Sequence, residues 1–79
     1  MKVHLKLHGT LPDHYQGPYS DAGLIFEFKD AVSVAELVDY VGLPRKRIGL
    51  VSINGRLAKA GDLIPDGATV KFLQSIAGG

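Results

Sequence analysis

The chain of 79 residues is long enough for one compact domain and too short for two separate hydrophobic cores. Its 9 basic and 8 acidic side chains nearly balance, which argues against nucleic-acid binding because that normally needs a concentrated basic surface. Hydrophobic residues make up 46% of the chain, which excludes a disordered protein, and the lack of cysteine excludes disulfides, thiolate-zinc sites and a cysteine nucleophile.

The first pattern in the chain has a period of two residues over 2–8, which predicts a half-buried strand. Its apolar side chains share one face and alternate with lysine and histidine; they are Val3, Leu5 and Leu7. This alternation lacks the unbroken apolar stretch of a secretory signal, and no apolar run is long enough to span a membrane. We therefore expect a cytoplasmic protein that does not contact membranes.

Residues 10–23 contain proline, glycine, serine and aspartate without a sustained period, which predicts a long exposed loop. Tyr15 and Tyr19 lie in this loop, and we expect them to pack it against the edge of the sheet. Residues 24–29 again alternate and predict a second strand, with one face formed by Leu24, Phe26 and Phe28. The two strands are expected to form a hairpin with a long connection.

A helix is predicted over roughly residues 34–41. Ser33 followed three residues later by Glu36 is the sequence of a capping box, in which each side chain satisfies a free backbone amide. Gly42 suits the left-handed residue that closes a helix, and Pro44 prevents its continuation. The apolar stripe at helical spacing consists of Val34, Leu37, Val38 and Val41.

The second half of the chain predicts three further strands. Residues 50–53 lead into Asn54–Gly55, a strong signal for a tight hairpin, and 56–58 form the short returning strand. Asp66–Gly67 marks another turn, and residues 69–73 form the last strand. The element order therefore predicts an α+β fold of four to five strands and one main helix, in which the first and last strands lie side by side at the centre of a mixed sheet.

Side chains that often carry catalysis do not form a recognisable set. His4 and His8 lie about 13 Å apart along one strand at the usual rise per residue, too far to be adjacent ligands of one metal. His14 lies in the loop, and no acidic residue has the spacing of a triad or a metal site. The cations at 45–47 form either a solvated loop or a docking patch for an acidic partner. We expect no enzymatic activity and no bound cofactor or metal.

The end of the chain carries the most distinctive chemistry. Gly78 and Gly79 have no side chains, so a terminal carboxylate on them could enter a narrow channel of another protein. The capping box, residues 51–56, Asp66–Gly67 and the last four residues (Ile76-Ala77-Gly78-Gly79) together resemble the ubiquitin-like sulfur-carrier family of ThiS and MoaD. The resemblance covers the chain from end to end and is loosest over the loop at 10–23.

The resemblance implies a single β-grasp domain over residues 1–79 with a flexible C-terminal tail over 74–79. It also implies that an E1-like adenylating enzyme uses ATP and Mg to activate the carboxylate of Gly79. A sulfur donor, such as a cysteine desulfurase or a persulfide protein, would then convert the adenylate to a thiocarboxylate. The sulfur would pass to thiazole synthase or to the large subunit of molybdopterin synthase.

Within this interpretation, several side chains near the end bind the partner enzyme. Alternation on the last strand turns Val70 and Phe72 toward the helix and leaves the opposite positions facing outward. Leu73 would be an exposed apolar anchor, unless the loop that contains the two tyrosines covers it. The predicted partner-binding residues are Lys71, Leu73, Ser75, Ile76, Ala77 and Gly78.

Two pathways and two other functions remain open at this level. The last six residues resemble the thiamin-thiazole carriers, whereas the chain length and the long first loop resemble the carriers for molybdopterin or tungsten cofactor. The same tail would also suit a protein modifier joined to target lysines through Gly79, or a non-covalent binding domain. The free chain is expected to be a monomer.

Overall fold

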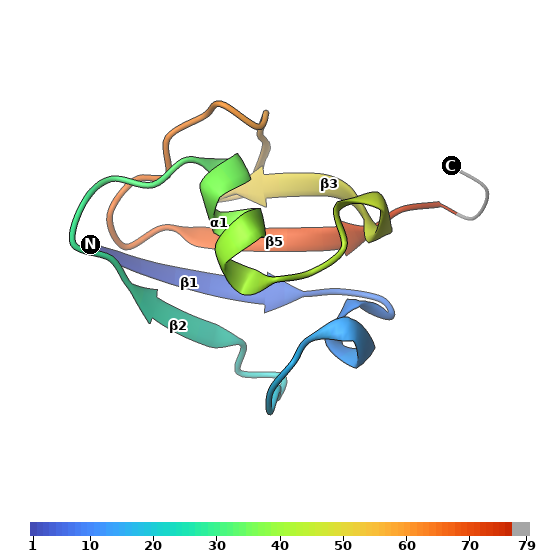
Figure 1. Ribbon diagram of the computed structural model, residues 1–79. Coiled ribbons are helices and arrows are strands. Elements are labelled where there is room, and N and C mark those ends of the chain that lie inside the picture. Colours follow the sequence, from blue (N-terminus) through green and yellow to red (C-terminus); the bar gives the residue numbers. More distant parts are fainter. Residues whose placement is uncertain (77–79) are drawn as a thin grey trace.

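The computed structural model describes residues 1–76, in which one α-helix packs across one face of a five-stranded mixed sheet (Figure 1). Two short 3₁₀ turns flank these elements. The elements in chain order are β1 (Lys2–Leu7), η1 (Leu11–His14), β2 (Leu24–Glu27), α1 (Val34–Val41), η2 (Arg45–Arg47), β3 (Ile48–Ile53), β4 (Arg56–Leu57) and β5 (Thr69–Gln74).

The sheet has the strand order β2-β1-β5-β3-β4. β1 and β5 are parallel, with Leu5 beside Val70 and Leu7 beside Phe72, and the other neighbouring strands are antiparallel. The first and last strands are therefore side by side at the centre, as the sequence predicted. The α+β class and the mixed sheet are confirmed.

The core lies between this central strand pair and α1. Val3 and Leu5 of β1 and Val70 and Phe72 of β5 have no exposed surface. The helix stripe predicted from its spacing is buried against them and consists of Val34, Leu37, Val38 and Val41. None of the helices within residues 1–76 has both the length and the apolar character that a bilayer span needs.

The ends of α1 follow from local chemistry. The Ser33 side chain accepts a hydrogen bond from the Glu36 amide at 3.2 Å, and the Glu36 carboxylate accepts one from the Ser33 amide at 2.9 Å. At the other end Gly42 has a φ of 82°, a left-handed conformation that glycine adopts without strain. The predicted capping box and the predicted bounds of the helix are both confirmed.

Strand β2 ends earlier than the sequence predicted. It ends at Glu27, opposite Lys2, although the Phe28 amide still donates a hydrogen bond to the Met1 carbonyl at 2.8 Å. Phe28 still packs inward, and the centroid of its ring lies 5.0 Å from the ring centroid of Tyr40 on α1 in an edge-to-face arrangement. The alternation of residues 24–29 therefore predicted the buried face correctly and the strand length incorrectly.

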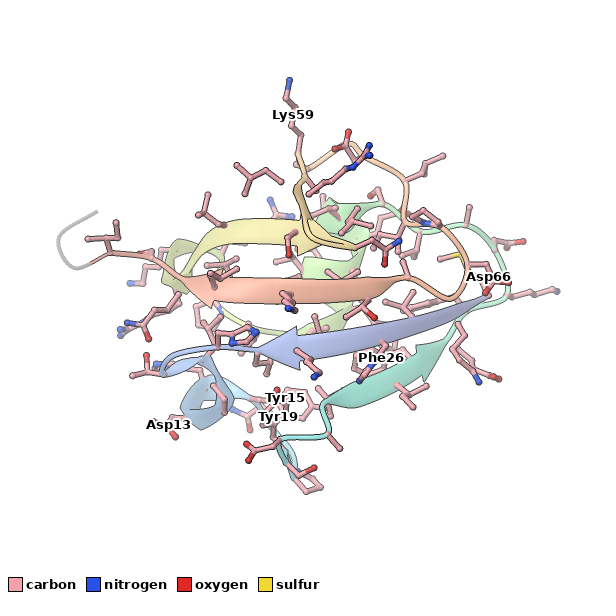
Figure 2. The ribbon with its side chains drawn as sticks, turned by 180° about the vertical axis from the view of Figure 1, so that it is seen from behind. Asp13, Tyr15, Tyr19, Phe26, Lys59 and Asp66 are labelled. Carbon is pink, nitrogen blue, oxygen red and sulfur yellow. The ribbon has the colours of Figure 1, made fainter. Side chains whose placement is uncertain are left out.

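The connection between β1 and β2 is more ordered than the predicted exposed loop. It contains η1, which buries Leu11 completely. The Tyr19 hydroxyl accepts a hydrogen bond from the Leu7 amide at 2.8 Å and donates one to the Leu7 carbonyl at 3.2 Å. Tyr15 and Tyr19 lie together beside η1 in Figure 2 and pack on the core, as predicted.

The hairpin between β3 and β4 has the tight turn that its sequence predicted. Asn54 and Gly55 have φ values of 50° and 85°, and positive φ at both central residues is what a two-residue type I′ hairpin turn requires. The Asn54 carboxamide oxygen also accepts a hydrogen bond from the Thr69 amide at 2.9 Å, and so links this turn to the start of β5. β3 starts at Ile48, two residues before the predicted strand, and β5 continues one residue further, to Gln74.

Candidate functional site

The central strand β5 positions the partner-binding residues predicted from the sequence. Val70 and Phe72 point into the core, so the residues between and after them face the side of the sheet opposite α1. Lys71 and Leu73 are accordingly exposed. This face is open to solvent because α1 covers only the other side of the sheet (Figure 1).

Leu73 has an apolar neighbour on this open face. It stands opposite Leu50 of β3 in the strand register, and the exposed fractions of the two side chains are 37% and 53%. Ile76, two residues beyond the end of β5, is 86% exposed. Exposed aliphatic side chains therefore line the path along which the chain leaves the sheet. The Tyr15 loop does not bury Leu73, so the alternative in which the loop covers it is wrong.

A pair of lysines lies next to this apolar surface. Lys6 on β1 stands beside Lys71 on β5 in the parallel register, and Ser52 of β3 lies on the other side of Lys71. Like charges on directly neighbouring strand positions repel each other. Within residues 1–76 the single ion pair joins Arg45 to Asp39, so neither lysine forms an ion pair with a carboxylate of the described chain. The sequence did not reveal Lys6 because the register of β1 against β5 cannot be read from alternation.

The point where the chain leaves β5 is fixed by two close contacts. The Ser75 amide donates a hydrogen bond to the Arg47 carbonyl at 2.8 Å. The backbone of Gly49 lies so close that an added Cβ would be 2.7 Å from the Ser75 Cα atom, a distance that no side chain tolerates. Sequence reasoning missed Gly49, although a glycine inside a strand pattern is a known sign of a bulge or a close backbone approach.

The last residue of β5 adds a third contact. The Gln74 side-chain oxygen accepts a hydrogen bond from the Thr10 amide, which ties the start of η1 to the end of β5. The Gln74 side chain occupies the space where a Cβ at Gly9 would lie. No sequence signal distinguished Gln74 from any other polar residue. Gln74 and Ser75, the first residues of the predicted tail, are thus still hydrogen-bonded to the rest of the domain.

The remaining predicted site residues fall outside the described part of the chain. Ser75 is half-buried, and the exposed Ile76 is the last residue that the structure describes. The predicted carrier residue Gly79 and its neighbours Ala77 and Gly78 lie beyond it. The structure therefore places the base of the predicted tail and not its reactive end.

The histidines occupy separate positions. His4 donates from Nε2 to the Ala22 carbonyl at 2.8 Å and so holds the end of the first loop against β1. His8 is exposed after β1, and His14 is half-buried at the end of η1. Among residues 1–76 no three histidine, aspartate or glutamate side chains are grouped so that they could share a metal ion.

The candidate site is thus a surface and an exit point, made by β5 and its two neighbouring strands. Comparison of the chain with family models, with curated proteins and with solved structures gives no match. The geometry of the open face and the position at which β5 ends are therefore the structural grounds for assigning a function.

Proposed function

We propose that this chain is a ubiquitin-like sulfur carrier with a β-grasp fold, and that the carboxylate of Gly79 is its reactive group. The observation that carries the proposal is the course of β5. This strand runs through the centre of the sheet and ends at an exit held by the Ser75–Arg47 hydrogen bond, beside exposed Leu73 and Ile76. A carrier needs a rigid base and an adjacent docking surface at the place where its reactive end begins.

The arrangement of the sheet supports the fold part of the proposal. One helix crosses a mixed sheet whose N-terminal and C-terminal strands are parallel neighbours at its centre. The two outer pairs are antiparallel hairpins, and this is the layout expected of a β-grasp domain. The sequence resemblance and the strand order thus favour the same fold.

The chemistry of the proposal places every demanding step in a partner enzyme. A carboxylate is a poor acyl donor, and adenylation gives it a good leaving group. A Gly79 oxygen bonds to the α-phosphorus of ATP and pyrophosphate leaves; the terminal sulfur of the donor's persulfide then bonds to the acyl carbon and AMP leaves. A second thiol attacks the donor's inner sulfur, forms a disulfide with it and releases the thiocarboxylate. The chain has no cysteine, so its terminal acyl group is where it would carry sulfur. Magnesium and the groups that stabilise the developing charge belong to the adenylating enzyme.

The open face suggests how that enzyme would recognise the carrier. Leu73 and Leu50 offer an apolar contact, and such anchors often contribute most of the binding energy at an interface. Lys6 and Lys71 lie beside them, and neither forms an ion pair within residues 1–76. An activating enzyme with an apolar patch bordered by carboxylates would bury the leucines and neutralise the lysines at the same time.

The proposal is tested by the intact mass of the protein. The chain is incubated with ATP, magnesium, free cysteine, a thiol reductant, a cysteine desulfurase and the E1-like enzyme of the thiazole or the molybdopterin pathway. The expected product has gained the mass difference between sulfur and oxygen, and fragmentation places this gain on the last peptide. A variant that lacks Gly78 and Gly79 serves as the control and should show no gain.

Other results would overturn the sulfur-carrier proposal. An unchanged mass with both activating enzymes, each shown to be active on its own carrier, would contradict it. Denaturant-resistant conjugates of higher mass in cells, formed without any thiocarboxylate, would instead identify a protein modifier. A function that survives removal of the two glycines would identify a non-covalent binding domain.

A further inference from the structure

A groove lies on the helix side of the sheet, at the edge formed by β3 and β4. Its volume is about 450 Å³, within the usual range of ligand-binding clefts. The lining is mainly aliphatic and includes Val34, Val38, Ile48, Val51, Leu57 and Ala58. Gly49 and Leu50 also border the groove, but Lys71 and Leu73 do not. The groove therefore adjoins the candidate docking face of Leu50, Lys71 and Leu73 at one edge and otherwise lies on the helix side of the sheet.

Strand β3, which lines this groove, has an edge that is paired over only part of its length. β4 is only two residues long and pairs with Ser52 and Ile53. One further hydrogen bond follows, from the Ala58 amide to the Val51 carbonyl at 2.9 Å. Beyond it, within residues 1–76, no strand lies next to residues 48–50 on that side, because β4 is the last strand of the sheet. Such an edge can accept an added strand from another chain.

The border of the groove is positively charged. Arg45 and Lys59 both line it, and Lys59 points away from the body of the protein in Figure 2. Arg45 is already paired with Asp39 at 2.7 Å. The Asp62 carboxylate accepts a hydrogen bond from the Lys59 backbone amide at 2.9 Å. The Lys59 ammonium itself forms no ion pair among the described residues. With its neighbours in 45–47, this border would favour an acidic ligand.

We propose that the groove binds an extended peptide segment of a partner protein that carries alternate apolar side chains and flanking acidic residues. The peptide backbone adds to the edge of β3, and its apolar side chains pack against Val34 and Val38 of α1. The unpaired residues 48–50 span about 7 Å at the rise of a strand, which suits about three paired peptide residues. The proposal does not rest on the sulfur-carrier function, because it uses neither β5 nor the chain end.

The aliphatic lining decides against a nucleic acid as the ligand. A nucleic acid would use the cations and leave the apolar surface of the groove without a partner. A β-strand peptide uses all three features together, because its backbone pairs with the edge, its alternate side chains fill the groove and its acidic flank meets the cations. The experiments therefore test separately the order of apolar residues in the peptide and the charge at the border of the groove.

The first experiment selects ligands from a displayed library of random nine-residue peptides, with the full chain as bait. Enriched peptides should carry apolar residues at alternate positions and aspartate or glutamate at one end. A scrambled peptide of the same composition should bind at least about tenfold more weakly. In ¹⁵N-labelled protein, titration with the selected peptide should shift the amides of Val38, Val51 and Ala58. The proposal is overturned by no enrichment, by equal binding of the scrambled peptide, or by shifts centred on Leu73.

The second experiment uses variants of the groove. Lys59→Glu should weaken binding of the selected peptide roughly tenfold, whereas Lys29→Glu, the same change in the segment after β2, should not affect it. Ala60→Trp, at an exposed position on the groove lining, should abolish binding by filling the space. Both groove variants should still form the thiocarboxylate if the chain is a sulfur carrier. Equal binding by Lys59→Glu and Lys29→Glu would contradict the proposed site.

Discussion

Leu73 is the residue on which the proposed docking face depends most directly. Leu73→Asp should weaken activation by the adenylating enzyme by at least about tenfold, because a carboxylate replaces an apolar contact that binding would desolvate. The fold should remain intact because 37% of this side chain is already exposed. ATP–pyrophosphate exchange with the cognate enzyme measures the effect.

A matched control for this substitution is available on the same chain. Leu63 is 65% exposed and lies in the connection between β4 and β5, away from the exit of β5. Leu63→Asp should leave the exchange rate unchanged. Equal rates for wild type and Leu73→Asp would show that Leu73 does not anchor the partner.

Gly49 is the residue that lets the chain leave the sheet at the observed place. Gly49→Ala should lower the free energy of unfolding by about 1–3 kcal/mol, because the new methyl group would overlap the Ser75 backbone. Gly61→Ala is the control, since an added Cβ there meets no atom within 4 Å. Urea unfolding of both variants tests this prediction, and equal stability of the two would contradict it.

At the scale of elements, the N-terminus of α1 has a stability contribution that can be isolated. Ser33→Ala removes the side-chain oxygen that accepts the Glu36 amide, and should cost about 1 kcal/mol of the free energy of unfolding. In a domain of this size that corresponds to a fall of about 4–8 °C in Tm. Ser33→Asp retains a capping oxygen and should unfold close to the wild-type temperature. Thermal unfolding followed by circular dichroism distinguishes the two variants.

Elements with a local chemical signal were predictable from the sequence, and those that depend on neighbours were not. The bounds of α1 follow from Ser33 and Gly42, which act within one turn of the helix. The end of β2 at Glu27 depends on its pairing with β1, which no property of residues 24–29 reveals. η1 was missed because proline and polar residues are typical of both a 3₁₀ turn and a loop, and only tertiary packing buries Leu11.

At the scale of the whole molecule, stability should be concentrated in the central strand pair. The His4 amide donates to the Ala68 carbonyl at the junction of β1 and β5, next to fully buried Leu5 and Val70. Its hydrogen exchange should require global unfolding, whereas the Ala58 amide at the sheet edge should exchange through local opening. Native-state hydrogen exchange in increasing denaturant measures both free energies. Faster exchange at His4 than at Ala58 would contradict this distribution.

The candidate docking face shows how far sequence reasoning reached for the molecule as a whole. Alternation sufficed to predict that Lys71 and Leu73 face outward, because the alternating positions Val70 and Phe72 are strongly apolar. Their neighbours Lys6 and Leu50 belong to other strands, and the register that brings them together is set by packing over the entire sheet. The groove beside β3 was not predicted either, because it arises from the shortness of β4 relative to its partner.

The central place of β5 has a consequence for biosynthesis of the protein. A ribosome makes β1 first and β5 last, yet each is the other's neighbour in the folded sheet. Until residue 74 has emerged, α1 and the β1–β2 hairpin have no middle strand on which to close. The nascent domain must therefore complete its core only after its last strand has been translated, and pairing its most distant segments is expected to limit the folding rate.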